Sequence, residues 1–504
     1  MTDLLLAIDQ GSSSSRAVLF DAGLAPVAAA SRPLATALPG PGLVEHDPAG
    51  ITASVLGSMS DALTTAGARW TDVASLGIAA QTETFVVWDA RTGEPVYPAI
   101  SWRDTRAAGL CAKLRADGRG PVVRASTGLP LEPAFSAPKL RWLLDEVPGA
   151  QQAAAAGRLL FGDVGCWLTW RLSGGTAHLT EPSLASRTML FGLADGAWNE
   201  EMLDLFGVPA AMLPAVGPTA GRLAVTDQVV CGGAVPVTAL AGDQQAALFG
   251  HRCWEEGQAK LTLGTGAFVW CNAGPRPPAD PPPGVVASCA WRFGTGGRYA
   301  LEGFVPNAGS VTTWLRGLGV LGPGEWPAIR PAAFEAAPGA GPWCVPALFG
   351  LGTPDWTPVA TAQIGGLTAS STGADIAEAA LAGVAHQVAD AIDAAGAGLA
   401  GPLGVIKTDG GLSRNDSLLA AIAGLTGLTL ERSSAAEVTA LGAASLAAIG
   451  AGLADRETLA RRPAEGGQLF SPAWPAGQAA AARAAWRERL GRVLGGHGLG
   501  GTPS

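Results

Sequence analysis

The sequence predicts an α/β fold built from two similar halves. An apolar strand at residues 4–9 leads into a turn of one glycine and four serines, and a second apolar strand follows at 16–21. The same design recurs when a strand at 258–263 ends in Gly264-Thr265-Gly266-Ala267 and a strand at 268–271 follows. Each hairpin heads a stretch in which strand and helix patterns alternate. We therefore expect a duplicated fold with two phosphate-binding turns facing a cleft.

Length and composition narrow the class of protein. A chain of 504 residues is too long for one hydrophobic core, so two or three domains are expected. Its 48% hydrophobic and 15% charged residues are typical of a well-packed enzyme. The net charge of −9 comes with interspersed signs and no Lys/Arg run, which argues against nucleic-acid and anionic-membrane partners. The four lysines are outnumbered by arginines, which we interpret as genomic composition bias.

Cysteine usage and the N-terminus predict a cytoplasmic protein. The seven cysteines form no CxxC pair, and no basic, apolar leader with a cleavage site precedes the first strand. Reduced, mostly buried thiols are therefore expected. No apolar run is long and charge-free enough to span a bilayer.

The remaining elements follow from local patterns. In the first half, further strands are expected at 26–31, 74–79 and 85–88, and helices near 48–67, 102–116, 138–146 and 198–205. The second half predicts helices at 375–396, 416–426 and 437–450, and a strand at 405–408. The segments 274–284 and 321–342 are rich in Gly and Pro and are expected on the surface. The Gly-rich tail from Gly495 is expected to be disordered.

The first turn suits a metal and phosphate site. The carboxylate of Asp9 ends a buried strand and can hold Mg²⁺ directly or through water. Backbone N–H groups and hydroxyls of the Gly/Ser turn can cradle phosphate oxygens, and Arg16 adds a planar cationic donor. An ordinary polar hairpin would explain these residues equally well. The turn is not a P-loop, because no GxxxxGK[ST] is present.

Four small-residue turns follow apolar stretches, and the set is more specific than any member. They lie at 9–16, 242–245, 264–267 and 409–415. The second opens a helix with Asp243, for which N-terminal capping is the simple explanation. The functional interpretation is a general base that accepts a hydroxyl proton.

Together these motifs resemble the FGGY family of carbohydrate kinases, and within it the glycerol kinase-like branch. The resemblance covers nearly all of residues 3–455. The matching motifs are Asp9-Gln10-Gly11 with its hydroxyl turn and the segments 81–89, 100–104, 127–130, 135–145, 242–250, 264–266 and 409–415.

The resemblance implies an actin-like ATPase fold, with two ribonuclease H-like domains flanking a catalytic cleft. Residues 1–247 would form the polyol-binding domain with the first phosphate turn, and 248–455 the nucleotide-binding domain. Residues 456–504 would add a C-terminal helix and a flexible tail. The implied reaction is ATP- and Mg²⁺-dependent phosphorylation of a small polyol or sugar. A homodimer or homotetramer is the corresponding expectation.

Site residues are carried over position by position. Asp243 would be the catalytic base and, with Asp9, would serve the metal. The polyol pocket would contain Thr82, Glu83, Trp102, Ala134, Asp243, Gln244 and Phe268. The nucleotide would contact Ser12, Ser13, Ser14, Arg16, Gly264, Thr265, Gly266, Gly309, Thr313, Gly410, Gly411 and Asn415. Closure of the two domains would exclude water, which competes with the alcohol for the phosphoryl group.

The chain departs from the glycerol kinase pattern at four positions. Thr82 and Ala134 stand where that pattern has an Arg and a Tyr in the pocket. Both changes remove bulk and hydrogen-bonding reach, so we hypothesise a longer polyol or sugar, or weak glycerol binding. Thr313 replaces a Gln near the nucleotide. Ala234 stands where regulated relatives carry an Arg for a sugar bisphosphate, so such control is not expected.

Other functions remain open at this point. A ketose kinase is the nearest, although Gln81-Thr82-Glu83-Thr84 is closer to the glycerol branch than to the Gly-Gln-Met-His of xylulose kinases. ATP-driven chaperones and filament proteins share the expected fold but lack a hydroxyl base and a polyol pocket. A non-catalytic relative is disfavoured because Asp9, Asp243 and both phosphate turns are intact.

Overall fold

The computed structural model describes residues 3–294, 296–322, 324–334, 341–435, 437–462, 466–475 and 477–495. The tail beyond Gly495 and part of the Gly/Pro-rich segment 321–342 lie outside the described residues.

The first large sheet contains the hairpin that bears Asp9. Its strand order is β13-β14-β5-β1-β2-β3. The bounds are β1 (Leu4–Gln10), β2 (Ser14–Phe20), β3 (Pro26–Pro33), β5 (Val73–Ala80), β13 (Ala220–Val225) and β14 (Pro236–Gly242). Strands β1, β2 and β3 form an antiparallel meander, β5 runs parallel to both β1 and β14, and β13 is an antiparallel edge.

The second large sheet repeats this plan. Its order is β17-β18-β16-β15-β21-β22-β23. The bounds are β15 (Ala259–Leu263), β16 (Ala267–Asn272), β17 (Val286–Phe293), β18 (Gly296–Val305), β21 (Ile406–Asp409), β22 (Leu430–Arg432) and β23 (Gln468–Phe470). Strands β15, β16 and β18 form the meander, and β21 and β22 continue it in parallel. Apart from the additional edge strand β17, the two sheets have the same order and directions, which confirms the duplicated α/β fold.

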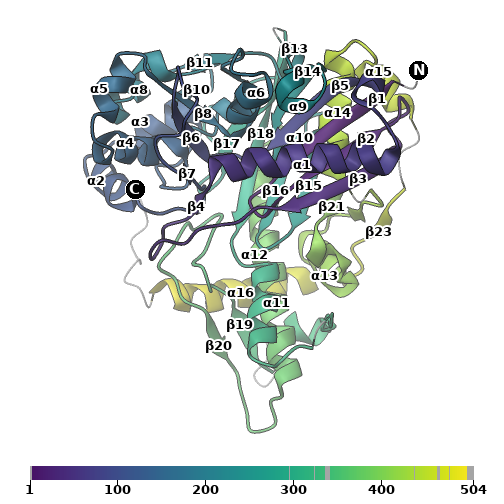
Figure 1. Cartoon of the computed structure of the whole chain (residues 1–504). Coiled ribbons are helices and arrows are strands. Elements are labelled where there is room, and N and C mark those ends of the chain that lie inside the picture. Colours follow the sequence, from purple (N-terminus) through teal and green to yellow (C-terminus); the bar gives the residue numbers. More distant parts are fainter. Residues whose placement is uncertain are drawn as a thin grey trace.

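Helices cover the large sheets (Figure 1). Helix α1 (Pro48–Ala66) lies along β2 and β3, and α14 (Val438–Gly450) packs on the opposite face against β1, β5 and β14. In the second half, α12 (Gly373–Ala397) covers β16 and β18, and α13 (Asp416–Thr426) packs against α12. Each half therefore buries its own hydrophobic core between sheet and helices.

Helices α10 (Asp243–Gly250) and α14 approach each other closely. A Cβ at Gly442 would lie 1.8 Å from the carbonyl oxygen of Ala246, and one at Gly250 would lie 2.3 Å from that of Val438. Only glycine fits at these two positions. The contact holds α10, which begins with Asp243, firmly against the first half.

A smaller four-stranded sheet lies beside the first large sheet. Its order is β4-β7-β6-β8, with β4 (Glu45–His46), β6 (Phe85–Asp89), β7 (Ala99–Ile100) and β8 (Leu159–Asp163). The other helices of this part of the chain are α2 (Ala108–Ala116), α3 (Gly120–Thr127), α4 (Ser136–Glu146), α5 (Ala150–Ala155), α6 (Val164–Leu172), α7 (Pro182–Ala185), α8 (Glu200–Phe206) and α9 (Gln228–Cys231). The remaining elements are β9 (Leu179–Thr180), β10 (Phe191–Gly192), β11 (Ala197–Trp198), β12 (Ala215–Val216), β19 (Trp343–Val345), β20 (Gln363–Gly365), α11 (Gly309–Gly317), α15 (Arg456–Arg461) and α16 (Gln478–Gly495).

Two expected helices were placed too early. The helix expected at 102–116 begins only at Ala108, because Asp104 holds the preceding segment in a turn: its carboxylate accepts hydrogen bonds from the backbone N–H groups of Val44 and Arg106. The helix expected at 198–205 begins at Glu200, capped by Asn199. The elements that were not predicted include strands β8, β13, β14, β17 and β18 and helices α3, α6 and α11.

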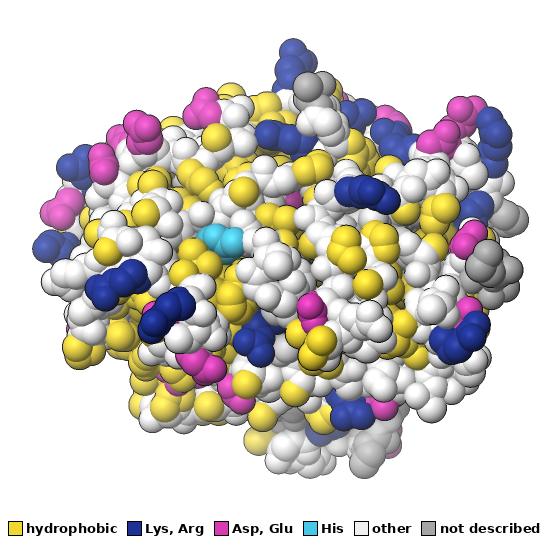
Figure 2. Space-filling view, turned by 45° about the horizontal axis from the view of Figure 1, so that its top comes forward, with side chains coloured by type: hydrophobic (Ala, Val, Ile, Leu, Met, Phe, Trp, Pro, Cys, Tyr) yellow, Lys and Arg dark blue, Asp and Glu magenta, His cyan; other side chains and the backbone are white. Residues whose placement is uncertain are grey.

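The cysteines and the surface agree with the composition. All seven cysteines lie in the described part of the chain, and each is a buried free thiol. On the face shown in Figure 2, cationic and anionic side chains are interspersed among apolar ones. Within the described ranges, no helix combines the length and the apolar character needed to cross a membrane.

Candidate functional site

Two carboxylates lie at the same edge of the first sheet, at the ends of two strands that are separated by one strand. Strands β1 and β14 flank β5, and Asp9 of β1 and Ala241 of β14 both align with Ala79. Asp243 therefore follows at the same edge of the sheet, at the start of α10. Its Oδ1 accepts a hydrogen bond from the N–H of the next residue, Gln244, at 2.7 Å, so it does not cap the helix in the usual way.

Burial perturbs both carboxyl groups. It raises the pKa of Asp9 to about 7, and the neighbouring carboxylates of Asp243 and Glu437 add to the shift while Arg16 opposes it. Burial also raises the pKa of Asp243 to about 6. The two buried carboxylates repel each other, so a cation bound between them would stabilise their ionised forms.

One face of the second sheet presents two rows of side chains opposite these carboxylates. Across β15, β16 and β18, Lys260, Trp270 and Glu302 lie in register, and so do Thr262, Phe268 and Phe304. Side chains alternate along a strand, so these six share one face. This face meets the first half, since Glu302 pairs with Arg187 and Lys260 bonds to Gln244.

Between the two halves lies a cavity of about 170 Å³. Its lining includes all seven residues predicted for the polyol pocket, together with Ser12. Of its described lining residues, six are aromatic: Trp102, Phe135, Phe268, Trp270, Phe304 and Trp356. Flat aromatic faces suit the C–H side of a polyol or sugar, while the polar side chains of the lining can hold its hydroxyls.

Glu83 is the most constrained polar residue of this cavity. It lies in the turn between β5 and β6 with φ of +62°, a left-handed conformation rare for a residue with a side chain. Such strain is typical of functional sites. Its Oε2 accepts a hydrogen bond from Thr82 Oγ1 at 2.7 Å, and Oε1 accepts one from Arg187 Nε at 2.5 Å. Its carboxylate is thus fixed in place, with lone pairs remaining for a ligand.

Sequence reasoning missed Arg187 and Glu302. Arg187 Nη1 lies 2.7 Å from Glu302 Oε2, and both side chains are buried. Burial raises the pKa of Glu302, and the Arg187 guanidinium opposes the shift. The only hint in the sequence is an arginine that interrupts the otherwise uncharged run at 182–194.

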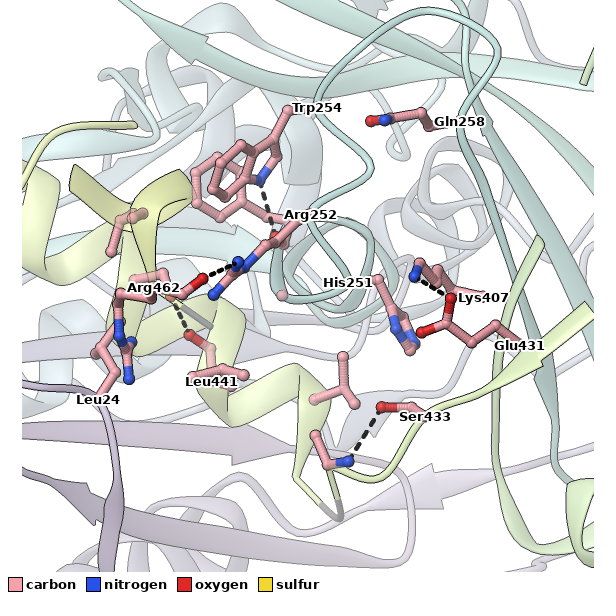
Figure 3. A pocket seen from close by; sticks show the side chains of 16 residues that line it. Leu24, His251, Arg252, Trp254, Gln258, Lys407, Glu431, Ser433, Leu441 and Arg462 are labelled. Carbon is pink, nitrogen blue, oxygen red and sulfur yellow. Dashed lines mark hydrogen bonds and ion pairs between the residues drawn. The ribbon is translucent and has the colours of Figure 1, made fainter. Parts of the chain in front are cut away.

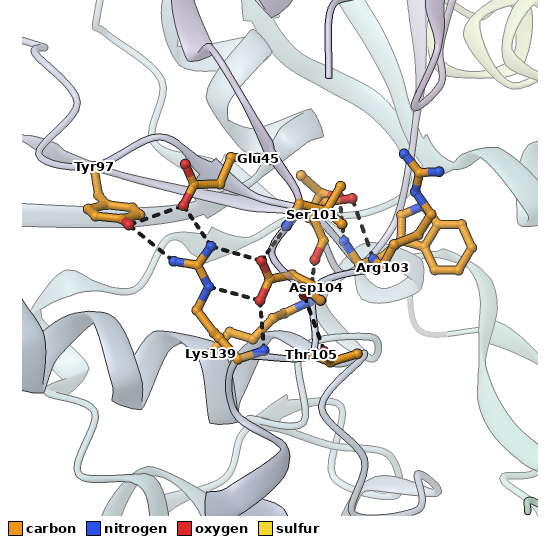
Figure 4. Close-up of polar contacts among 12 residues, drawn as sticks. Glu45, Tyr97, Ser101, Arg103, Asp104, Thr105 and Lys139 are labelled. Atoms are coloured by element: carbon orange, nitrogen blue, oxygen red, sulfur yellow. Dashed lines mark hydrogen bonds and ion pairs between the residues drawn. The ribbon is translucent and has the colours of Figure 1, made fainter. Parts of the chain in front are cut away.

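A polar cluster supports the walls that contain Trp102 and Ala134 (Figure 4). The guanidinium of Arg106 is held by Glu45, Tyr97 and Asp104. The fully buried ammonium group of Lys139 donates hydrogen bonds to the carbonyl of Ser101 at 2.8 Å and to that of Ala134 at 2.6 Å.

Through these two hydrogen bonds, Lys139 connects Ser101, which precedes Trp102, to Ala134. Burial lowers the pKa of Lys139 to about 7, while the carboxylates of Glu83 and Asp104 oppose the shift. Two walls of the cavity share this one support.

The first phosphate turn is partly engaged with the cavity. Ser12 Oγ accepts a hydrogen bond from Trp102 Nε1 at 2.9 Å and donates one to Gln81 Oε1 at 3.3 Å. Ser13 is exposed, and Ser14 already belongs to β2. Arg16 stands opposite Asp9 in the hairpin and forms an ion pair of 2.7 Å with Glu437.

The second turn packs against the start of α11 and the end of β21. The N–H groups of Gly309 and Ser310 donate to the carbonyls of Gly264 and Thr265 at 2.9 and 3.0 Å. A Cβ at Gly309 would lie 2.6 Å from the carbonyl oxygen of Gly264. At Gly410, with φ of +89°, a Cβ would lie 2.5 Å from that of Leu263. Four predicted nucleotide residues, Gly264, Thr265, Gly309 and Gly410, are therefore brought together.

Three further predicted positions at this end belong to helices or to a helix cap. Thr313 lies one turn into α11, and its hydroxyl donates to the carbonyl of Gly309 at 3.3 Å. Asn415 caps α13 by accepting from the N–H of Leu418 at 3.1 Å, and its Nδ2 donates to the carbonyl of Pro327 at 3.3 Å. Gly411 opens the short helix Gly411–Arg414.

A second cavity, of about 300 Å³, lies beside the C-terminal end of α10. In Figure 3, Lys407 and Glu431 face each other on one side of it, and Arg252 reaches toward Arg462 on the other. Its described lining includes no residue predicted for the site. His251 also lines it, and its Nε2 lies 2.6 Å from Asp409 Oδ2.

Comparisons with known proteins agree with this geometry. The family model described as the FGGY family of carbohydrate kinases, N-terminal domain, matches residues 4–250, and the model of the C-terminal domain matches residues 259–451. A glycerol kinase of Citrifermentans bemidjiense is 45% identical over 460 residues, covering 91% of this chain and 92% of that protein. One of Thermus brockianus is 44% identical over 495 residues, covering 97% and 98%.

Solved structures show the same fold. The crystal structure of Plasmodium falciparum glycerol kinase with ADP superposes with a TM-score of 0.88 at 27% identity, covering 98% of both chains. A xylulose kinase of Rhodospirillum rubrum superposes with a TM-score of 0.81 at 23% identity, covering 98% of this chain and 99% of that one.

Proposed function

This chain belongs to the FGGY family of carbohydrate kinases, and we propose that it transfers the γ-phosphoryl group of ATP to a hydroxyl of glycerol or a related small polyol. The observation that carries the proposal is the cavity between the halves, which contains a strained acceptor, Glu83, and a buried carboxylate, Asp243. A neutral alcohol is a weak nucleophile, and a carboxylate beside it accepts its proton.

Each side of the cavity has a task in this reaction. Asp243 takes the proton from the attacking hydroxyl, and its burial gives it a pKa of about 6, suited to a base at neutral pH. Glu83 accepts hydrogen bonds from neighbouring hydroxyls. Trp102 offers its ring to the carbon chain. Phosphoryl transfer depends mainly on positioning and on neutralisation of charge, and these contacts supply the positioning.

ATP would lie along the turns at Gly11–Ser13 and 264–266, toward Gly309 and the 409–415 loop. Mg²⁺ fits the chemistry of Asp9 and Asp243, because it prefers one or two carboxylates with waters and substrate phosphates. The described residues contain no cluster of three or more His, Cys, Asp or Glu side chains that could hold a metal alone, which suits a cation shared with phosphates. Mg²⁺ would neutralise charge on the transferred group. A homodimer or homotetramer stays a prediction.

A second candidate substrate is a longer polyol of four to six carbons, or a ketose. Thr82 and Ala134, both small, line the cavity. The Thr82 hydroxyl already donates its hydrogen bond to Glu83, so its proton is not free for a hydrogen bond to a ligand. These two small side chains leave more room in the cavity than an Arg and a Tyr would. This room, beside several aromatic faces, favours an acceptor substrate larger than a triol.

A substrate panel tests the proposal. ADP release would be measured with glycerol, with C4–C6 polyols and with ketoses at the same ATP and Mg²⁺ concentrations. Turnover with glycerol at micromolar KM and none with the larger compounds supports a dedicated glycerol kinase. Preference for a larger compound supports the second candidate. ATP hydrolysis that no alcohol stimulates contradicts both.

The double variant Thr82→Arg/Ala134→Tyr provides a second test of the acceptor. Restoring the bulk of the glycerol kinase pattern should lower KM for glycerol and raise it for the larger acceptors. Unchanged preference would show that these two positions do not determine the substrate.

A further inference from the structure

Lys260 is a fully buried lysine that reaches from one half of the molecule to the other. It is the second residue of β15, with 0% of its surface exposed. Its Nζ donates a hydrogen bond to Gln244 Oε1 at 2.6 Å and another to Thr262 Oγ1 at 2.9 Å. Gln244 belongs to α10, directly after Asp243, and lines the cavity. The buried ammonium group of Lys260, from the second sheet, thus contacts Gln244 of the proposed polyol pocket.

This contact determines which way the amide of Gln244 faces. A lysine ammonium group has donors only, so the Gln244 atom that it meets must be the oxygen. The NH₂ group lies on the other side of the planar amide. Among the contacts of the described residues, Gln244 Nε2 has no protein partner, although the side chain lines the cavity. The NH₂ group is therefore available as a donor to a bound molecule.

Burial and nearby carboxylates act on the pKa of Lys260 in opposite directions. Burial lowers its pKa, and the carboxylates of Asp409 and Asp243 oppose that shift. Glu302, in the same row of the sheet, acts in the same direction.

We propose that Lys260 is a positioning residue for the acceptor substrate: it holds the amide of Gln244 so that its NH₂ group donates to a substrate oxygen. This rests on the proposed function. The pocket then has an acceptor side, formed by Glu83 and Asp243, and a donor side, formed by Gln244. A substrate fits when one oxygen accepts from Gln244 while its hydroxyls donate to the carboxylates. A polyol or a sugar does this, and a simple monohydric alcohol cannot.

Steady-state kinetics with three variants test the role. Lys260→Met removes the ammonium group and keeps most of the stem, and it should raise KM for the acceptor at least about tenfold while KM for ATP changes less than about threefold. Gln244→Glu keeps an oxygen for Lys260 but turns an acceptor toward the cavity, so it should raise acceptor KM similarly. Lys407→Met is the matched control. Lys407 lies on the same sheet face as Lys260 and pairs with Glu431, but neither of them lines the proposed polyol pocket.

A double variant separates positioning from a general structural effect. If Lys260 acts through Gln244, adding Lys260→Met to Gln244→Ala should raise acceptor KM by less than about twofold further. An undiminished additional increase, a normal acceptor KM in Gln244→Glu, or an equal effect of Lys407→Met would overturn the proposal.

A structural measurement distinguishes this proposal from the proposed function. In a crystal structure of the Lys260→Met variant, the Gln244 side chain should leave its wild-type rotamer or show more than one. An unmoved, well-ordered Gln244 contradicts the positioning role whatever the substrate is. Absence of acceptor-dependent turnover in the wild-type protein contradicts the proposed function instead.

Discussion

Arg187 and Glu302 form a buried ion pair that joins the two halves of the molecule beside the cavity. The Nη1–Oε2 distance is 2.7 Å, and the same guanidinium also holds Glu83. Glu83 belongs to the first half and Glu302 to the second sheet. The cavity is therefore complete only when both halves are together.

Arg187→Met should be strongly destabilising. It leaves the carboxylates of Glu83 and Glu302 buried without their cation, which typically costs about 3–5 kcal/mol. Calorimetry should show a clear fall in Tm, and KM for the acceptor should rise because Glu83 loses a partner. The matched control is Arg461→Met, which removes an exposed ion pair with Glu457 and should cost about 1 kcal/mol or less. Equal shifts in the two variants would contradict this account.

Asp243→Asn should retain nucleotide binding and lose nearly all transfer. The amide has the same shape but cannot accept the hydroxyl proton, and general-base catalysis is worth about 10²–10⁴-fold. Turnover would be measured with saturating acceptor, and ADP affinity by calorimetry. Wild-type turnover in this variant would remove Asp243 from the base role.

Asp9→Ala should raise the Mg²⁺ concentration required for half-maximal activity. The variant removes one of the two carboxylates at the strand ends, so the cation is held by fewer oxygen ligands. An increase of about tenfold or more is expected in a Mg²⁺ titration at fixed ATP. Asp3→Ala, an exposed position before β1, provides the control. An unchanged Mg²⁺ requirement would contradict the assignment of Asp9.

The pH dependence of kcat/KM should follow the raised pKa values of the strand-end carboxyl groups. Both groups must be ionised to act, and their pKa values in the ligand-free protein are about 7 and about 6. At limiting Mg²⁺, kcat/KM should therefore fall as the pH decreases through this range. Saturating Mg²⁺ favours the ionised forms and should move the fall to lower pH. A profile flat between pH 5 and pH 8 at both concentrations would contradict the prediction.

The sequence predicted best what depends on short segments. Hairpins with small-residue turns and the start of α10 are local patterns, so Asp9, Asp243 and the 264–266 turn could be singled out directly. Residues of the cavity such as Glu83 and Trp102 were identified through the family resemblance, and the structure places them in one cavity, while their roles stay predictions.

Residues whose importance comes from register were not predicted. Glu302 and Lys260 matter because β18, β16 and β15 align them with Trp270 on one sheet face, and strand β18 itself was missed. Lys260 was visible as one of few lysines, inside a predicted strand. The start of α2 was predicted too early for a similar reason. Asp104 accepts a hydrogen bond from the N–H of Val44, which is far away along the chain.

Helix α10 has one further consequence. Asp243 is its first residue, and His251, which contacts Asp409 of the Asp409-Gly410-Gly411 segment, directly follows its last. Eight helical residues span about 12 Å and bend little over that length. The helix is therefore a short rigid rod with the proposed proton acceptor at one end and, through His251, the proposed nucleotide loop at the other. A rigid shift of this helix along its axis would displace both ends, so in the proposed reaction a movement of the Asp409-Gly410-Gly411 segment could be passed on to Asp243.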